Sequence, residues 1–389
     1  MVGYNIVMED LNNPEIIFRD LPQSRKRPIF PKHIETKVIE ELDKLNSIPL
    51  KTQEWKDIYW KDTPTGIPLT IDLPRMEMTN KWSIGDCRND VIYYDEERMK
   101  NENIQIINES CVVTYKGEIV CLYINEKTDK AVTKATEKLR KLGKQMETHY
   151  PVQKNTFYTG FRLGAKTPEA KQKAHEYKQS RMAIPRYKGK NYLDGMICYF
   201  RSPHPNKSRG YGHTIAFQPR NESADTDEDF LFNYAYSSCA LYALEKRYAP
   251  NVAKYRLDLA TSNGFVGIIP PLPLELNPST GFGGSVDFAS SIHNDSGLKG
   301  LTETIIWTTP PDKTKKQYFI VPEFKVAFDL HTHNAIILQP PKIAHGTCDT
   351  GNHGGYGFVN ITKGTILRKG KPTDIKKKWY EVWKHHFEI

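Results

Sequence analysis

The chain has 389 residues, 38% of them hydrophobic and 11% aromatic, which is enough to bury a large core in one elaborated domain or in two. Its formal net charge is +9, and its six cysteines lie far apart without a C-x-x-C pair, which argues against a structural zinc cluster and a compact disulfide scaffold. No apolar run reaches the ~18 residues of a membrane helix, and the N-terminus lacks a secretory pattern. We therefore expect an intracellular protein with no membrane association, and nothing in the sequence indicates a protein partner.

Residues 1–150 read as an N-terminal α+β elaboration. An apolar periodicity predicts a helix over 34–45, and alternating apolar residues around the turn YKGE predict a β-hairpin within 104–125. A second helix is predicted over 128–146, where Ala131, Ala135, Leu139 and Leu142 fall on one face.

The segment 162–211 is strongly basic. From Arg162 to Arg209 there are twelve basic and three acidic residues, and tyrosines are interleaved with them. This mixture is typical of surfaces that contact phosphates and stack bases, although a solvated lysine-rich helix over 167–181 followed by a loop is the simpler interpretation. If the segment binds nucleic acid, we expect the contacts from Lys178, Arg181, Arg186, Lys188, Lys190, Arg201, Lys207 and Arg209.

The remainder of residues 151–389 is predicted to be rich in short strands. A helix is expected over 225–250, starting at a run of acids and stopping at Pro250. From residue 255 onward, seven or more short apolar segments are separated by Gly, Pro, Asn and Asp, which is typical of a β-barrel or a double-sheet jelly roll. A basic helix over 373–386 closes the chain. The predicted fold is thus α+β, with a jelly-roll core and flanking helices.

The stretch VDFASSIHND ends in His293 and Asp295, two residues apart. Side chains at i and i+2 of a strand point to one face, so this pair and a later His345 could form the 2-His-1-carboxylate triad of non-haem Fe(II) oxygenases. An H-x-D pair alone is more often a turn. His331 and His333 are rival candidates of the cupin type, but no suitably spaced glutamate follows them, which favours a structural role.

The same stretch resembles the motif D-F-x-x-x-x-H-x-D of the TET and J-binding-protein family, Fe(II) oxygenases that oxidise 5-methylpyrimidines in DNA. Asp287, Phe288, His293 and Asp295 match the motif at its own spacing, and AIILQPPKIAHGT is similar to the segment with the distal histidine. The resemblance covers about residues 225–365. It implies a double-stranded β-helix, Fe(II) held by His293, Asp295 and His345, O2 as oxidant, double-stranded DNA containing 5-methylcytosine as partner, and a nuclear location.

Departures from the family concern the co-substrate and the base. The arginine that holds 2-oxoglutarate in the family is replaced by Tyr356 when the segments are set in register, and the next cation is Lys363. The chain is similar in this to the algal branch of the family, which uses ascorbate and attaches a glyceryl group to 5-methylcytosine. Leu298 and Gly364 stand where animal members contact the base, and the cysteine-rich zinc region of those members is missing.

Several functions therefore stay open at this point. Ascorbate-dependent modification of 5-methylcytosine is favoured, with Tyr356 and Lys363 near the co-substrate. Hydroxylation of 5-methylcytosine or thymine with 2-oxoglutarate is the first alternative. An oxygenase of the same fold acting on RNA, nucleotides or protein is the second, because fold does not determine substrate. A nucleic-acid-binding module without chemistry is the third.

Overall fold

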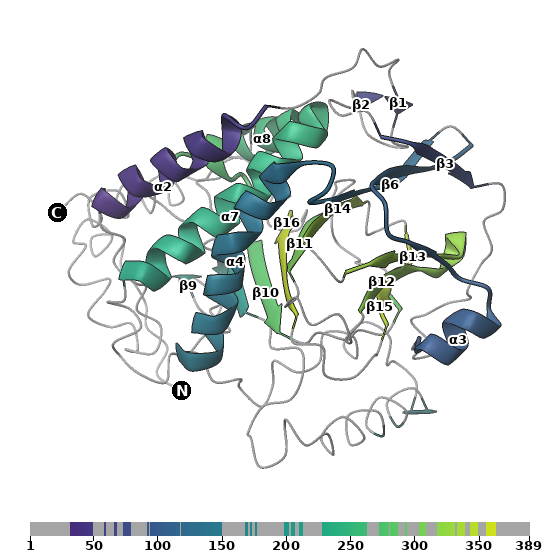
Figure 1. The fold of residues 1–389 in the computed structure, drawn as a ribbon. Helices are drawn as coiled ribbons and strands as arrows, with labels where there is room; N and C mark the ends of the chain where they lie inside the picture. The colour runs from purple at the N-terminus through teal and green to yellow at the C-terminus, as the bar shows by residue number, and fades with distance from the viewer. Residues whose placement is uncertain are drawn as a thin grey trace.

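Two β-sheets and a layer of helices make up the computed structural model (Figure 1). The structure describes residues 32–49, 58–59, 66–67, 73–78, 92, 94–116, 118–149, 168–169, 172, 176, 198–201, 204–206, 210–212, 228–262, 272–279, 281–286, 292–293, 303–308, 317–330, 333–338, 343–348 and 355–362. The helix expected over 373–386 and most of the basic segment lie outside these residues. Among the described helices, none combines the length and apolar character needed to cross a bilayer.

The larger sheet has eight strands in the order β3-β5-β6-β14-β11-β16-β10-β7. Three of them come from the N-terminal part of the chain, so residues 1–150 and the later residues share one sheet. The strands are β3 (Arg75–Met78), β5 (Cys111–Tyr115), β6 (Glu118–Asn125), β14 (Asn334–Leu338), β11 (Glu303–Thr308), β16 (Tyr356–Ile361), β10 (Gly281–Val286) and β7 (Cys198–Arg201). The hairpin expected within 104–125 is confirmed by the antiparallel pairing of β5 and β6.

The smaller sheet has four strands in the order β15-β12-β13-β4. They are β15 (Gly346–Thr347), β12 (Tyr318–Val321), β13 (Val326–Asp329) and β4 (Gln105–Ile107). An isolated antiparallel bridge between His293 and His345 lies just before β15. Two short ribbons complete the described strands: β1 (Ile58–Tyr59) with β2 (Gly66–Ile67), and β8 (His204–Asn206) with β9 (Gly210–Gly212).

The chain passes repeatedly between the two sheets after β10. It leaves the larger sheet for the bridge at His293, returns for β11, forms β12 and β13 in the smaller sheet, and returns again for β14. It then crosses to His345 and β15 and ends in β16 of the larger sheet. Strands distant in sequence therefore become neighbours, as in the pairing of β10 with β16.

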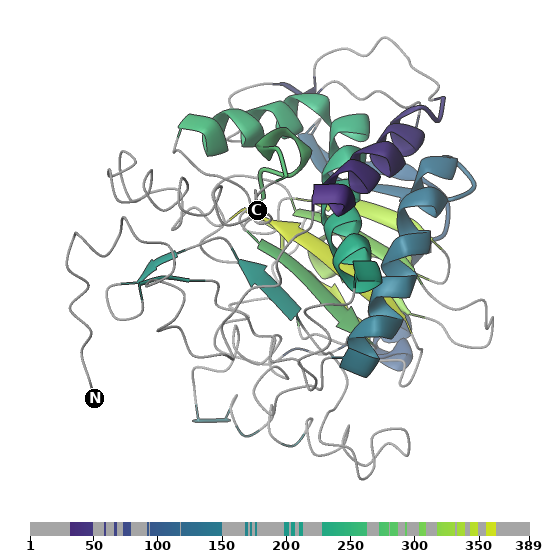
Figure 2. The ribbon, with the colours of Figure 1, turned by 90° about the vertical axis from the view of Figure 1, so that its left-hand side faces the viewer.

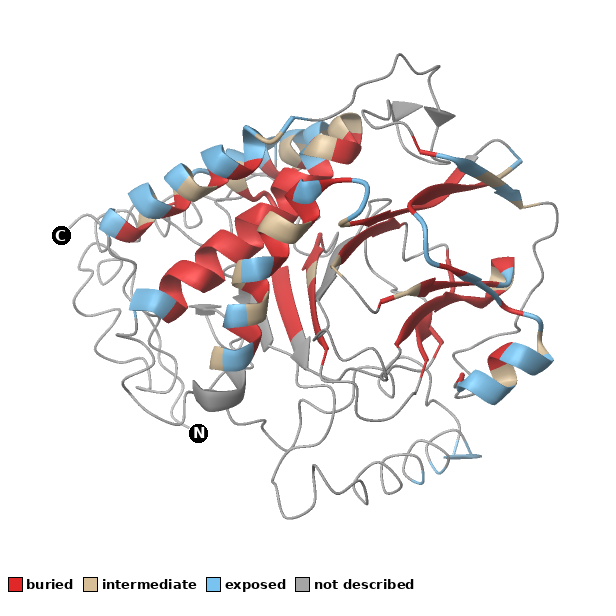
Figure 3. Cartoon of the chain, viewed as in Figure 1, coloured by how far each residue is buried: buried red, intermediate tan, exposed pale blue. Residues whose placement is uncertain are grey.

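Helices cover the face of the larger sheet that points away from the smaller one (Figure 1). With that side toward the viewer, α4 and α7 lie across the strands (Figure 2). The helix α7 is buried along almost its whole length, whereas α2 keeps one exposed side (Figure 3). The helices are α2 (Lys32–Asn46), α3 (Glu96–Asn101), α4 (Lys130–His149), α7 (Glu228–Tyr248) and α8 (Pro250–Ser262), with 3-10 turns η4 (Leu274–Leu276) and η5 (Pro322–Phe324).

Three of these helices, α2, α4 and α7, confirm the sequence predictions, whereas α3 and α8 were not predicted. The expected helix stop at Pro250 agrees with the end of α7 at Tyr248, but α8 begins at Pro250 itself. Proline is well suited to the first position of a helix, because the N–H that it lacks has no partner inside that turn. Pro250 therefore starts a second helix in place of ending all helical structure.

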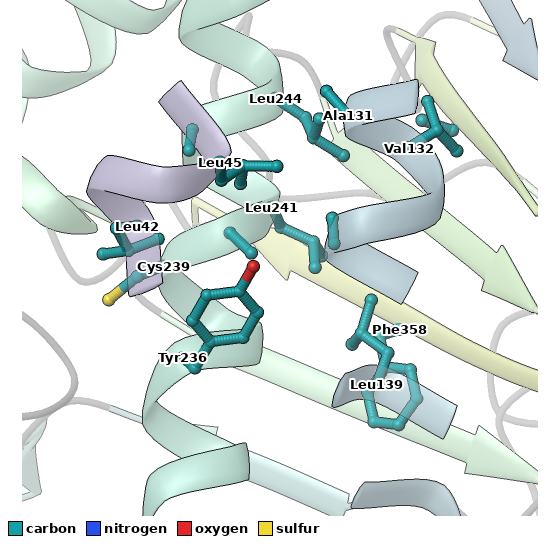
Figure 4. Packing of buried hydrophobic residues seen from close by; sticks show 14 of the residues in the cluster. Leu42, Leu45, Ala131, Val132, Leu139, Tyr236, Cys239, Leu241, Leu244 and Phe358 are labelled. Carbon is teal, nitrogen blue, oxygen red and sulfur yellow. The ribbon is translucent and has the colours of Figure 1, made fainter. Parts of the chain in front are cut away.

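The central strands of the larger sheet bury apolar side chains on both faces, because successive side chains of a strand point to opposite faces, as in β14. In β6, Leu122 and Ile124 join Leu139 of α4 and Leu241 of α7 in what we call the helix-side core. Figure 4 shows the helical part of this core, to which α2 contributes Leu42, α7 contributes Tyr236 and α4 contributes Leu139, together with Phe358 of β16. The intervening residues of β6 face the smaller sheet and form what we call the inter-sheet core, which includes Cys121, Tyr123, Phe319, Val321, Phe324, Val326, Phe328, Ile336 and Leu338.

A fully buried ion pair joins the helix layer to the ends of two strands. The guanidinium of Arg256 in α8 is paired with the carboxylate of Glu245 in α7, and both side chains have no exposed surface. Arg256 Nη2 also donates to Ser279 Oγ at 2.5 Å and Nε donates to Thr362 Oγ1 at 3.1 Å. These two residues precede β10 and follow β16, so one side chain connects four segments.

Replacing Arg256 by Ala should lower the free energy of unfolding by about 3–5 kcal/mol, because the carboxylate of Glu245 would remain buried without its partner. Chemical denaturation measures this change. The double variant Glu245→Leu, Arg256→Met should recover most of the loss, since it removes both charges. On the same helix, Lys254 makes an exposed pair with Asp258 at 2.6 Å, and Lys254→Ala should change stability by less than about 0.5 kcal/mol. Equal effects of the two alanine variants would contradict the burial of the Arg256 pair.

Candidate metal centre

The structure brings together two of the three histidine and aspartate side chains that the sequence predicts as metal ligands. His293 and His345 are directly opposite each other: the N–H of each donates to the carbonyl of the other, at 2.9 and 3.0 Å. Their ring centroids are 4.6 Å apart with an interplanar angle of 56°. Both are buried, with 8% and 4% exposed. Residues 52 positions apart in sequence are thus cross-strand neighbours.

Both imidazoles lie on the face of the smaller sheet that points to the larger sheet. The preceding residues, Ile292 and Ala344, belong to a separate cluster with Ile320 on the outer face. Successive side chains of an extended chain alternate between faces, so the histidines lie on the inner one. The ring of Phe319 confirms this, because it belongs to the inter-sheet core and stacks on the His345 ring at 5.5 Å and 19°.

A main-chain carbonyl orients the His345 ring. Nδ1 of His345 lies 2.9 Å from the carbonyl oxygen of Ile343, a distance at which a protonated Nδ1 donates to the oxygen. In the neutral ring this leaves the lone pair on Nε2, which is the form that a metal ligand needs. Metal-bound histidines commonly donate their other ring N–H to a carbonyl in this way. The contact therefore fits a metal-binding role for His345.

The third expected ligand, Asp295, lies outside the described residues. Within the part of the chain that the structure describes, no three His, Cys, Asp or Glu side chains gather closely enough to hold a metal ion. Lys363 and the residues at the base-contacting positions, Leu298 and Gly364, also lie outside it. The same holds for the side chains of the expected DNA-contacting residues: Lys178, Arg181, Arg186, Lys188, Lys190, Arg201, Lys207 and Arg209. Of these, only the backbone of Arg201 is described, opposite Gly281.

Tyr356 lies on the opposite side of the larger sheet from the histidines. Its ring belongs to the helix-side core with Phe358, and it packs against Gly143 of α4 so closely that a methyl group on Gly143 would overlap it. The expectation that Tyr356 contacts a co-substrate beside the histidines does not agree with this placement. By alternation along β16, Gly357, Val359 and Ile361 are the residues that face the smaller sheet.

His333, one of the rival metal candidates, also faces away from the histidine pair. It directly precedes β14, where Ala335 and Ile337 face the helices, and alternation puts His333 on the same side. Burial lowers the pKa of His333, and the nearby carboxylate of Glu126 partly offsets this effect. Its Nδ1 is buried without a hydrogen-bond partner. This geometry agrees with the structural role that the sequence favours; His331 lies outside the described residues.

Two contributors to the site were not predicted from the sequence. One is the Ile343 carbonyl, which no sequence pattern can indicate. The other is Phe319, in the run Tyr318–Val321, where all four residues are buried. Because that strand is apolar on both faces, its pattern does not distinguish the residue that touches His345 from those that face outward.

No protein-family model matches the chain, and no curated protein matches its sequence. Among solved structures, NgTET1 in complex with 5mC DNA aligns with a TM-score of 0.39 and 9% identity, over 91% of this chain and 98% of that one. JOX2 in complex with 2OG, Fe and JA aligns with a TM-score of 0.26 and 10% identity, over 89% and 96%. Both TM-scores lie below 0.5, and neither identity exceeds 10%.

The placement of Tyr356 can be tested through Gly143. A Gly-to-Ala change inside a helix ordinarily stabilises it by about 1 kcal/mol, but Gly143→Ala should destabilise this protein by about 1–3 kcal/mol because the methyl group meets the tyrosine ring. In a double-mutant cycle with Tyr356→Leu, the cost of Gly143→Ala should largely disappear. Additive effects in denaturant melts would show that the ring lies elsewhere.

Proposed function

We propose that this chain is a non-haem Fe(II)-dependent oxygenase whose iron is bound by His293, Asp295 and His345. The observation that carries the proposal is the pairing of His293 with His345 on the inner face of the smaller sheet. Two neutral imidazoles and one carboxylate suit Fe(II) and leave positions open for O2 and a co-substrate. Bound iron would supply the activation of O2. The protein would hold the ligands rigidly and exclude bulk water between the sheets.

The order of the strands supports a double-stranded β-helix as the frame of this site. Successive segments after β10 alternate between two sheets, and the inter-sheet core lies between them. Jelly-roll folds of this kind use eight strands in two sheets. When His293 and His345–Thr347 are counted as strands of the smaller sheet, the chain after β10 passes back and forth between the two sheets, as in a jelly roll. His293 and His345 then lie on neighbouring strands.

The proposed substrate is 5-methylcytosine in double-stranded DNA, modified at its methyl group. The support is the resemblance of VDFASSIHND to the TET and J-binding-protein motif, together with the basic, tyrosine-containing segment 162–211. An enzyme of this kind must take the base out of the duplex, which costs a few kcal/mol of unstacking energy, and the cations of that segment suit the flanking phosphates. A nuclear location follows from a DNA substrate and is part of the proposal.

We favour ascorbate over 2-oxoglutarate as co-substrate, on the inner face of β16. The described residues of β16 on that face are Gly357, Val359 and Ile361, and none of them can pair with the distal carboxylate of 2-oxoglutarate. Ascorbate has a neutral polyol at its far end and needs no such cation. Lys363, the first cation after β16 in the sequence, is the candidate cation for the 2-oxoglutarate alternative.

Iron binding can be tested with a matched pair of histidine variants. His345→Ala should abolish stoichiometric binding of Fe(II), measured anaerobically by equilibrium dialysis and metal analysis. His333→Ala should retain it, because His333 lies on the other face of the larger sheet. Asp295→Ala should behave like His345→Ala. Iron retained in His345→Ala would remove the basis of the proposal. A wild-type protein that binds no iron would be better regarded as a nucleic-acid-binding protein without this chemistry.

The reaction and its co-substrate can be identified together by mass spectrometry of nucleosides. The protein is incubated with 5-methylcytosine DNA, Fe(II), O2 and either ascorbate or 2-oxoglutarate. We expect an adduct heavier than hydroxymethylcytosine that needs only ascorbate, and no change in this requirement in Lys363→Met. A hydroxymethyl product that needs 2-oxoglutarate and is lost in Lys363→Met would support the alternative. No product with either, from protein that binds iron, would move the substrate to RNA, nucleotides or protein.

A further inference from the structure

The ring of Phe319 restrains the plane of the His345 imidazole. The two rings stack with centroids 5.5 Å apart and an interplanar angle of 19°. Phe319 is 5% exposed and comes from β12, whose partner strand β15 begins directly after His345. The stacking partner of His345 therefore comes from the strand next to its own, and its backbone is fixed by the same ladder.

Three separate contacts together determine the geometry of His345. The paired main-chain hydrogen bonds to His293 position its backbone. The Nδ1 contact to the Ile343 carbonyl selects the tautomer and limits rotation of the ring. That contact alone still allows the ring to tilt about the hydrogen bond. A flat apolar ring on one side of the imidazole removes this freedom and fixes the direction in which Nε2 points.

Phe319 is paired across strands with a residue that contacts the larger sheet. Its cross-strand neighbour is Phe328 of β13, which is fully buried and stacks on Tyr123 of β6 at 5.1 Å and 23°. The Tyr123 hydroxyl donates to the Asp329 carbonyl at 2.7 Å, and burial raises the pKa of this phenol well above its usual value. Ring contacts and one strand pairing thus connect the N-terminal hairpin to the candidate metal ligand.

We propose that Phe319 is a positioning residue for the metal ligand His345, an inference that rests on the proposed function. It acts on the metal only through the imidazole. Mutation of a residue that orients a metal ligand typically lowers metal affinity by about 10–100-fold. Since Tyr123 belongs to β6, residues 1–150 would support the metal site as well as the core. This assigns them a role beyond surface elaboration.

Co(II) binding to the full-length protein tests this inference, because the visible bands of Co(II) report ligand geometry and its titration gives a Kd without any turnover. Phe319→Leu keeps an apolar side chain and removes the planar ring. We expect Co(II) to bind about tenfold more weakly, with changed visible bands. Phe319→Tyr restores a planar ring and should return both readouts to the wild-type values. If Phe319→Leu does not fold, Phe319→Met replaces it with the same expected result.

Phe324→Leu is the matched control. Phe324 belongs to the same inter-sheet core and is 3% exposed, but its ring meets Tyr115 at 5.6 Å, edge to face. The variant Phe324→Leu should lower the melting temperature, as Phe319→Leu does, and should leave the Co(II) spectrum and the Kd unchanged. Wild-type Co(II) binding in Phe319→Leu, or equal weakening in both leucine variants, would overturn the positioning role while leaving the proposed function in place. A wild-type protein that binds neither Co(II) nor Fe(II) would overturn the proposed function and this inference together.

Discussion

The burial of the larger sheet on both faces is the constraint on which the rest of the structure depends. In β6, Leu122 and Ile124 face the helices, whereas Cys121 and Tyr123 face the smaller sheet. A shift of the pairing by one residue would exchange these sets completely, and the two environments differ, so the register is strongly specified. As a consequence, the face of the sheet on which a side chain lies depends on whether its position along the strand is odd or even. In the smaller sheet the same rule puts His345 inside and Ala344 outside.

Polar contacts then fix the helix layer on this sheet. Apolar packing alone tolerates sliding of a smooth helix, but α7 presents a carbonyl, Ser238 O, to Asn277 and Asn360 at 3.0 and 2.9 Å. The buried pair of Glu245 and Arg256 acts in the same region, between α7, α8 and the ends of β10 and β16. Desolvation offsets most of the attraction in such a pair, so we interpret it as specifying position more than adding stability. It thereby helps to hold β10 and β16 side by side.

The sequence predicts the features that are encoded within one segment, but not those that depend on the pairing of distant strands. The helix over 130–149 was predictable because Ala131, Ala135 and Leu139 repeat at helical spacing. His293 was predictable because it belongs to a motif of fixed spacing, and His345 because its segment resembles the one that carries the distal histidine. The side on which Tyr356 lies was not, because it depends on the pairing of β16 with β10 and β11. An alignment that is wrong by one residue after a variable loop reverses the face. Phe319 was missed for a related reason, since its strand is apolar on both sides.

The way in which the two histidines meet also bears on how a metal would be bound. Closing a loop of 52 residues lowers the chain entropy by an amount that grows slowly with loop length. Here the main-chain hydrogen bonds between His293 and His345 help to offset this loss. Metal affinity is therefore not reduced by the work of bringing these strands together, in contrast to small domains that fold only around their metal. What remains adjustable is the direction of each imidazole. For His345 that direction is set by the Ile343 carbonyl and the Phe319 ring, and this is why a residue that touches no metal can control its affinity.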